Sequence, residues 1–415
     1  MSRDDVSKER FGEVRSMLQR GPGEDHRAWS DTLWAMLETE QAQDPAGYAA
    51  KWVPYLAGFK GRWERSLRIL GSYAELEHAR VVAPFAVFDV RLAFPHVGQE
   101  DVVEVLRSPH LEAARSLRLT NIELDEAAAQ VWTNTRRPAA LEAVELRTVR
   151  FWGAALEEVA RSPLFEGLRA LEWAGDRLES EVVAALMRPE VTARLESVKM
   201  PRVGMDARGF AHLAGADAPA LRRLDVSANM LDAAAMEALA GARWVEGLEV
   251  LECAQNPLGR EGARALGRAL DGVRLEVLDL EGIAPRLLGE DVRALVDRDG
   301  VEALRKLSFK NVELTGGVSG MVRGGRPLLD ELRELEELHG GVAALVVCDR
   351  LTGLEELVLW SCGLGEMEAQ ALAGAAHLKS LRRLVLWGNA WLGKKGHAAL
   401  AASPYVGRLF KKRKK

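Results

Sequence analysis

Apolar residues recur along most of this chain in a block of about 27 residues. Clear copies begin at Leu221 and Leu248, and positions 1, 4, 6 and 11 of each copy are apolar. Positions 3 to 7 alternate between apolar and polar residues, which predicts a short strand with one buried face. Another apolar residue returns eighteen positions after the first, in alanine-rich stretches such as residues 262–266 that favour helix. Aligned on position 1, the copies start at Val87, Ala114, Leu141, Leu168, Leu195, Leu221, Leu248, Leu275, Leu304, Leu332, Leu354 and Leu381.

One strand and one helix in every repeat predict a stack with a parallel sheet on one side and helices on the other. Neighbouring strands lie about 4.8 Å apart, whereas helices are roughly twice as wide. A stack of such repeats should therefore curve, with the sheet on its concave side. We predict an α/β solenoid in which side chains at positions 3, 5 and 7 point out of the concave sheet.

The two clearest repeats read L-x-x-L-x-L-x-x-N-x-L, which is the signature of a leucine-rich repeat. Residues 87–402 resemble the ribonuclease-inhibitor-like class, whose repeats are 27 to 29 residues long and contain a true helix. The resemblance implies a right-handed horseshoe that binds proteins, and the alanine-, arginine- and glutamate-rich repeats resemble those of high-GC bacteria. The asparagine position departs from the pattern, because it is kept at Asn229, Asn256 and Asn389 but replaced at Pro95, Ile122, Val149, Val203, Ile283 and Val312, and filled by Cys362 in another repeat.

Three parts of the chain are expected. Residues 1–82 carry no repeat but contain Trp29, Trp34, Trp52 and Trp63, and we interpret them as a helical N-terminal cap over the apolar end of the solenoid. The stretch from Trp63 to Ile69 could add a degenerate first strand beside Val90. Residues 83–403 form the solenoid of about twelve repeats, and residues 404–415 form a C-terminal cap segment with a basic tail.

One segment interrupts the repeat. Five glycines from Gly316 to Gly325 stand where a helix should follow the strand, and glycine weakens helices. They lack the lysine and serine or threonine of a phosphate-binding loop. The segment is either an insertion in a decayed repeat or a loop that contacts a partner.

Charge and cysteine content indicate the cellular compartment and the possible contacts of the tail. The net charge is −5, but the tail residues Lys411, Lys412, Arg413, Lys414 and Lys415 are all basic. This tail is either a solvated end or a weak contact to nucleic acid, an anionic membrane or an acidic protein. Three cysteines cannot form a disulfide framework, and no apolar stretch is long enough to span a membrane. The charged N-terminus is unlike a secretory signal, so we expect a cytoplasmic protein.

Position 5 of the strands carries a column of acidic residues through the middle of the array. Carboxylates on neighbouring strands repel each other, and a basic partner would relieve this cost. Alternatively, Arg147, Lys199, Arg222 and Arg223 neutralise the column locally. The acidic residues assigned to partner binding are Glu145, Glu172, Asp225, Glu252 and Asp279, together with Glu281 at position 7.

The last two repeats share the letters Leu-Val-Leu-Trp, which place Val358, Trp360, Val385 and Trp387 on adjacent strands of the concave face. Tryptophan is enriched in binding hot spots, so these four residues complete the predicted partner surface. In the alternative interpretation the segment from Tyr405 to Phe410 folds back and covers them. Trp391, at position 11, is predicted to be buried.

No catalytic, cofactor or metal-binding motif is recognisable, and the histidines are scattered. We therefore predict a non-enzymatic scaffold that binds another protein through its concave face. A partner with a basic surface is one form of this prediction. The alternative is a structural component of a larger assembly, held by its flanks and basic tail. Regulation of a GTPase or another enzyme by one of the exposed arginines is a weaker hypothesis.

Overall fold

A computed structural model describes residues 3–20, 26–59, 69–314 and 340–410. The chain divides into two compact units, Met1–Glu172 and Trp173–Lys415. Twelve parallel strands follow one another in sequence order, as expected of a leucine-rich-repeat solenoid. Within the described part of the chain, no helix is both long and apolar enough to cross a lipid bilayer.

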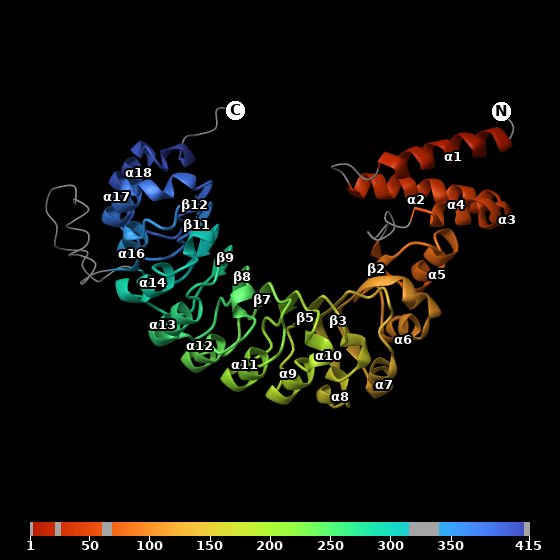
Figure 1. Cartoon of the computed structure of the whole chain (residues 1–415), viewed down its shortest axis with the longest axis horizontal. Helices are drawn as coiled ribbons and strands as arrows, with labels where there is room; N and C mark the ends of the chain where they lie inside the picture. Colours follow the sequence, from red (N-terminus) through yellow and green to blue (C-terminus); the bar gives the residue numbers. More distant parts are fainter. Residues whose placement is uncertain (1–2, 21–25, 60–68, 315–339, 411–415) are drawn as a thin grey trace. The chain divides into compact units, whose positions relative to one another are not determined.

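The first unit begins with helices and continues into strand–helix repeats (Figure 1). Leu70 of the first strand pairs with Val90 of the second, so the degenerate first strand is confirmed at its C-terminal end. Its main elements are α1 (Arg3–Arg20), α2 (His26–Gln43), α3 (Pro45–Gly47), η1 (Tyr48–Trp52), α4 (Val53–Ala57), β1 (Ile69–Leu70), α5 (Tyr73–Val82), β2 (Phe88–Ala93), α6 (Gln99–Arg107), β3 (Ala114–Leu124), α7 (Glu126–Asn134), β4 (Ala143–Phe151) and α8 (Leu156–Ala160), and β5 (Ala170–Ala174) lies at the division between the units.

Aromatic and polar contacts attach the N-terminal helices to the first repeats. The indole of Trp34 on α2 packs edge-on against Phe88 of β2, with 5.8 Å between ring centroids. The hydroxyl of Tyr48 donates a 2.6 Å hydrogen bond to the carbonyl of Val82 at the end of α5. Both Trp34 and Phe88 are buried. These contacts join α2 to β2 and η1 to the end of α5.

The second unit contains the most regular repeats. In Figure 1 its helices α11 to α18 lie along one side of strands β7 to β12. The elements are α9 (Ser180–Leu186), α10 (Pro189–Thr192), β6 (Ser197–Lys199), α11 (Ala207–Ala214), β7 (Arg223–Asp225), α12 (Ala233–Ala240), β8 (Val250–Glu252), α13 (Gly259–Ala269), β9 (Val277–Asp279), α14 (Gly289–Val296), β10 (Lys306–Ser308), α16 (Gly341–Val347), β11 (Glu356–Val358), α17 (Glu366–Gly374), β12 (Arg383–Val385), α18 (Gly393–Ala402) and η8 (Gly407–Leu409).

The strand register agrees with the apolar pattern of the sequence. Leu224, Leu251 and Leu278 are paired on successive strands, and all three are buried. Position 6 behaves in the same way, because Val226, Cys253 and Leu280 are fully buried. Side chains alternate between the two faces of a strand, so position 5 lies on the opposite face of the sheet, where Asp225, Glu252 and Asp279 are half-buried and Ser308 is buried.

The turn after each strand has a common backbone conformation. The residue at position 8 has a positive φ in repeat after repeat, whether or not it is glycine. These residues are Asn121, Thr148, Gly175, Arg202, Ala228, Gln255, Gly282, Asn311, Ser361 and Gly388.

The asparagines at position 9 of the repeat connect this turn to the preceding repeat. The side-chain oxygen of Asn229 accepts hydrogen bonds from the backbone N–H groups of Val203 and Met205, each at 3.0 Å. Its amide nitrogen donates to the carbonyl of Met200 at 2.8 Å. Asn256 makes the same contacts one repeat later, and Asn389 makes them between the last two repeats. The ladder is interrupted, as predicted, by buried apolar residues such as Val203.

Strand pairing joins the repeats that begin at Leu304 and Leu354. Leu307 of β10 pairs directly with Leu357 of β11, and the repeat start predicted at Leu332 lies between them in sequence, outside the described residues. Helix α16 therefore belongs to the repeat that begins at Leu304. Residues 315–339, which include Leu332 and the glycine-rich segment from Gly316 to Gly325, lie outside the described residues.

Candidate partner-binding surface

We call the side of strands β6 to β12 that faces away from the helices, and that carries positions 3, 5 and 7, the sheet face of unit 2. Asp225 on β7 pairs in register with Glu252 on β8, which pairs with Asp279 on β9. Adjacent parallel strands lie about 4.8 Å apart, so the three carboxylates form one row. We call these three residues the acidic row.

The acidic row retains repulsion between its members. Partial burial and the neighbouring charges of Asp225 and Asp279 raise the pKa of Glu252 above its usual value. Lys199 and Lys306 act in the opposite direction but do not reverse this shift. Within the described residues, no cation lies within 4 Å of a carboxylate of the row. Asp225 and Asp279 are partly stabilised by the backbone N–H groups of Ser227 and Glu281, respectively.

The two predicted acidic residues of the first unit have a different environment. Glu145 forms ion pairs with Arg118 and Arg147, and Arg147 also pairs with Glu172 at 2.6 Å. Glu145 and Glu172 are therefore neutralised by arginines of the first unit, and their part in partner binding stays a prediction. Arg222 does not contribute to neutralising the acidic row, because its guanidinium lies 3.9 Å from Glu249 instead.

Lys310 contacts both Glu281 and Trp360. The Lys310 ammonium lies 2.9 Å from a carboxylate oxygen of Glu281 and 5.2 Å from the ring centroid of Trp360. Asn311 adds a hydrogen bond to the same carboxylate at 3.2 Å. Sequence reasoning omitted Lys310, although its position 7 in the repeat from Leu304 was a sufficient signal.

Trp360 and Trp387 lie in the turns that follow the adjacent strands β11 and β12, and are exposed to 43% and 73%. Val358 and Val385 pair in register beside them and are half-buried. Gly388 has a φ of 76°, and a Cβ there would come within 3.0 Å of the Trp360 ring. This glycine allows the Trp360 ring to lie close to the turn after β12. We call Val358, Trp360, Val385 and Trp387 the tryptophan patch.

Trp391 corrects the sequence prediction, because it is 76% exposed instead of buried. Leu392, one residue later, is buried in its place. An isolated bridge pairs Trp391 with Gly365, which is position 12 of the preceding repeat. The last repeat is therefore offset by one residue at this point, and its tryptophan points outward.

The C-terminal segment packs near the beginning of β12. Val406 is fully buried, and the Arg408 guanidinium donates hydrogen bonds to the carbonyls of Lys379 and Leu381. The hydroxyl of Ser403 donates to the carbonyl of Ala373 at 2.6 Å. Residues as far as Phe410 leave the tryptophan side chains exposed, and the basic residues Lys411, Lys412, Arg413, Lys414 and Lys415 lie outside the described residues.

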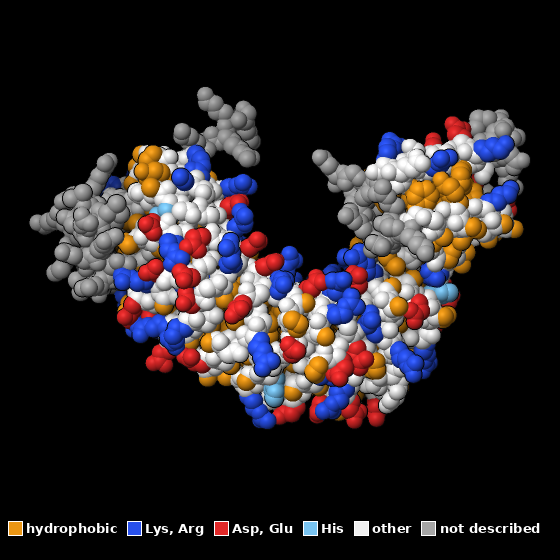
Figure 2. Space-filling model, viewed as in Figure 1, with side chains coloured by type: hydrophobic (Ala, Val, Ile, Leu, Met, Phe, Trp, Pro, Cys, Tyr) orange, Lys and Arg blue, Asp and Glu red, His pale blue; other side chains and the backbone are white. Residues whose placement is uncertain are grey.

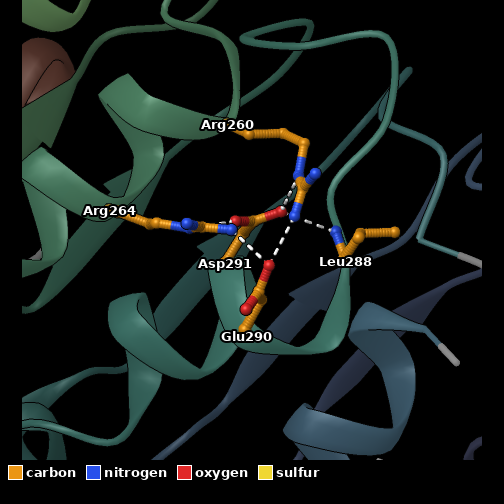
Figure 3. A network of polar contacts seen from close by, with 5 residues as sticks. All are labelled: Arg260, Arg264, Leu288, Glu290 and Asp291. Atoms are coloured by element: carbon orange, nitrogen blue, oxygen red, sulfur yellow. Dashed lines mark hydrogen bonds and ion pairs between the residues drawn. The ribbon is translucent and has the colours of Figure 1, made fainter. Parts of the chain in front are cut away.

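A second charge cluster lies between helices α13 and α14 (Figure 3). Asp291 is fully buried, and its two carboxylate oxygens accept from Arg260 and Arg264, each at 2.6 Å. It also accepts from the backbone N–H of Leu288 at 2.9 Å, and Glu290 bridges the same arginines. These hydrogen bonds lower the pKa of Asp291 despite its burial. Because the charges of the cluster pair with each other, it joins neighbouring repeats and needs no further counter-ion.

The visible surface of unit 2 also has acidic and basic side chains interspersed (Figure 2).

The cysteine thiols are poorly suited to nucleophilic chemistry. Cys253, Cys348 and Cys362 are all unpaired and buried. Burial raises the pKa of Cys362 to about 12, and the Cys362 thiol contacts the carbonyl of Phe309 at 3.0 Å. Burial also raises the pKa of Cys253 and Cys348. In the parts of the chain that are described, no group of three or more histidine, cysteine or acidic side chains could hold a metal ion.

No protein-family model and no curated protein matches the sequence. Among solved structures, a chain of the yeast Rad7 and Elc1 complex is similar at 13% identity and a TM-score of 0.48, covering 98% of this chain and 92% of that one. An internalin from Listeria monocytogenes has 13% identity and a TM-score of 0.44, with 79% and 86% covered. A chain of the TLR13–ssRNA13 complex has 14% identity and a TM-score of 0.41, and the match covers 77% of this chain but only 42% of that chain. Because these identities are below 25% and the TM-scores are below 0.5, the leucine-rich-repeat fold is assigned from the repeats and the parallel sheet of the chain itself.

Proposed function

We propose that this protein is a non-enzymatic scaffold that binds a partner protein through the sheet face of unit 2. The observation that carries this proposal is the exposure of Trp360 and Trp387 in the turns after the adjacent strands β11 and β12. Exposed apolar surface of this kind is costly in water and is typical of contact sites. Truncation of a tryptophan that becomes fully buried in an interface commonly costs about 2 kcal/mol or more of binding free energy.

The acidic row supports a partner with a basic surface. Asp225, Glu252 and Asp279 have no ion pair within the described residues, and a lysine or arginine of a partner would lower the repulsion among them. A nucleic acid on this face would place phosphates against the same carboxylates. A protein partner is therefore favoured over nucleic acid at this surface.

The chemistry of the described side chains favours binding over catalysis. Cys253 and Cys362 are buried thiols with raised pKa values, so little thiolate is available near neutral pH. The charged cluster around Asp291 is satisfied by its own arginines. Neither group resembles an activated nucleophile or a general base positioned beside substrate.

The setting and the family class are also proposals. Three free cysteines suit a reducing compartment, and we infer a cytoplasmic protein. The repeat length, with a helix such as α13 after the strand, supports the ribonuclease-inhibitor-like class, and the composition supports a bacterial source. We further propose that residues 1–82 cap the solenoid of residues 83–403, because Trp34 packs against Phe88 of its first strand.

Site-specific photo-crosslinking in cells that naturally encode the protein tests the proposed surface. A photoreactive residue would replace Glu252 or Trp387 on the sheet face, and Ala240 or His212 on the exposed helical side would serve as matched controls. We expect partner adducts from the sheet-face positions alone, with the partner identified by mass spectrometry. Adducts from the helical side alone would contradict the proposal and favour a structural component held by its flanks.

A further inference from the structure

The sheet face of unit 2 is divided into bands across its strands. The acidic row occupies β7 to β9, and the tryptophan patch occupies β11 and β12. Between them, β10 and the turn after it supply Lys306 and Lys310. A partner that contacts both outer bands therefore has to cross the basic band.

The basic band, Lys306 and Lys310, would gain little from contact with a partner. Lys310 is already paired with Glu281 at 2.9 Å and stacked on Trp360. This arrangement also joins the bands, because one lysine contacts a carboxylate on one side and an indole on the other. A partner gains most at the two ends, where the carboxylates of the acidic row form no ion pair with a described residue and the Trp387 indole is 73% exposed.

Glu252 is the centre of the acidic end. It pairs in register with Asp225 on one side and Asp279 on the other, so a single cation above it would interact with three carboxylates. Partial burial of Glu252 reduces solvent screening and strengthens such an interaction. One arginine or lysine could therefore act as the polar anchor of a partner.

Strand spacing fixes the separation of the two anchors. Trp360 lies in the turn after the third strand beyond that of Glu252 and Trp387 in the turn after the fourth, which places them roughly 14 to 19 Å away across the strands of the sheet. Residues about eleven positions apart on a helix lie on the same face and are separated by about 16 Å.

Resting on the proposed function, we propose that the partner is recognised as one helical segment crossing strands β8 to β12, with a lysine or arginine over Glu252 and an apolar side chain over Trp360 and Trp387. The segment has a defined direction. In the reverse orientation its cation would approach Lys310 and its apolar residue would desolvate the acidic row, both of which are unfavourable.

Binding of synthetic peptides to the full chain tests this inference. Alanine-based helical peptides would carry one arginine and one leucine pair, separated either by about eleven residues or by about four residues. A third peptide would have glutamate in place of the arginine in the long spacing. Fluorescence anisotropy at low salt should show at least tenfold tighter binding of the long-spaced arginine peptide than of either alternative.

Charge exchange separates electrostatic recognition from damage to the fold. Glu252→Lys should reverse the preference, so that the glutamate peptide binds better than the arginine peptide. Glu145→Lys is the matched control, because Glu145 is already paired with Arg118 and Arg147, and it should leave the preference unchanged. Equal affinities for both spacings, an unaltered preference in Glu252→Lys, or no peptide binding would overturn the two-anchor inference. The crosslinking result judges the proposed scaffold function independently, because it does not depend on peptide spacing or charge.

Discussion

The ammonium group of Lys310 lies 5.2 Å from the ring centroid of Trp360. The same ammonium pairs with Glu281, so acidic and aromatic residues of the sheet face belong to one connected surface. This contact crosses from β10 to β11, whose residues are paired although a long segment separates them in sequence. It turns two separate predictions, an acidic column and a tryptophan pair, into one candidate binding surface.

Burial of position 4 predicts a large effect of Leu251→Ala. The side chain is buried between Leu224 and Leu278, so truncation should leave a cavity and lower the free energy of unfolding by roughly 2–5 kcal/mol. Arg223→Ala, on the exposed face of the same sheet, should change it by less than about 0.5 kcal/mol. Chemical denaturation measures both, and similar losses would contradict the strand register.

The asparagine turn predicts a second large loss for Asn256→Ala. The substitution leaves the N–H groups of Asn229 and Leu231 and the carbonyl of Val226 without the Asn256 side chain. Each buried unsatisfied group costs about 1–3 kcal/mol, so we expect a total loss above about 2 kcal/mol. Asn134→Ala, at the exposed end of α7, provides the control and should have little effect in the same denaturation experiment.

Repulsion in the acidic row predicts that Glu252→Gln stabilises the protein at neutral pH. The folded state raises the pKa of Glu252, so its ionised form is destabilising, and this destabilisation appears as pH rises through the raised pKa. The gain should reach about 1 kcal/mol at pH 7.5 and disappear below about pH 3, where the carboxyl is protonated in both the folded and the unfolded state. Melting temperatures across this range test the prediction. Glu145→Gln, which removes ion pairs with Arg118 and Arg147, should give no such gain.

The cluster between α13 and α14 predicts the opposite pH dependence. Hydrogen bonds from Arg260, Leu288 and Arg264 lower the pKa of Asp291, so its stabilisation is present above the unfolded-state pKa of about 3.9 and is lost as pH falls through the folded pKa. Asp291→Asn should lower the free energy of unfolding by about 1–3 kcal/mol at pH 7. Larger values are not expected, because both arginines are partly exposed and solvent screens their charges. Its deficit should shrink below about pH 4 in acid titrations of unfolding. A deficit that is constant with pH would argue for a packing effect.

The exposed tryptophans predict a loss of binding without a loss of folding. Trp387→Ala should reduce affinity for the crosslinked partner by more than about tenfold. It should lower the free energy of unfolding by less than about 1 kcal/mol, whereas Trp244→Ala, at a buried site, should cost about 3–5 kcal/mol. Isothermal titration and denaturation of the two variants distinguish these effects. Normal binding by Trp387→Ala with a large loss of stability would show that the residue has a structural role.

The sequence by itself determined the repeat, the strand register and the burial of positions 4 and 6. The pattern around Leu224 and Leu251 is local, because period-two alternation assigns each side chain to one face and burial of leucine favours only one register. The sheet-face positions of Asp225 and Glu252 followed from the same alternation. The tryptophan pair was visible for the same reason, since two successive repeats carry identical letters.

Tertiary structure alone decided which of these residues have partners. Arg118 and Arg147 neutralise Glu145, while the acidic row lacks ion pairs among the described residues, and this difference depends on the side chains of neighbouring repeats. The pairing of β10 with β11 required the fold, because apolar spacing cannot distinguish an inserted segment from another repeat. The outward position of Trp391 had the same kind of cause, since burial of the adjacent Leu392 is settled by packing against the preceding repeat.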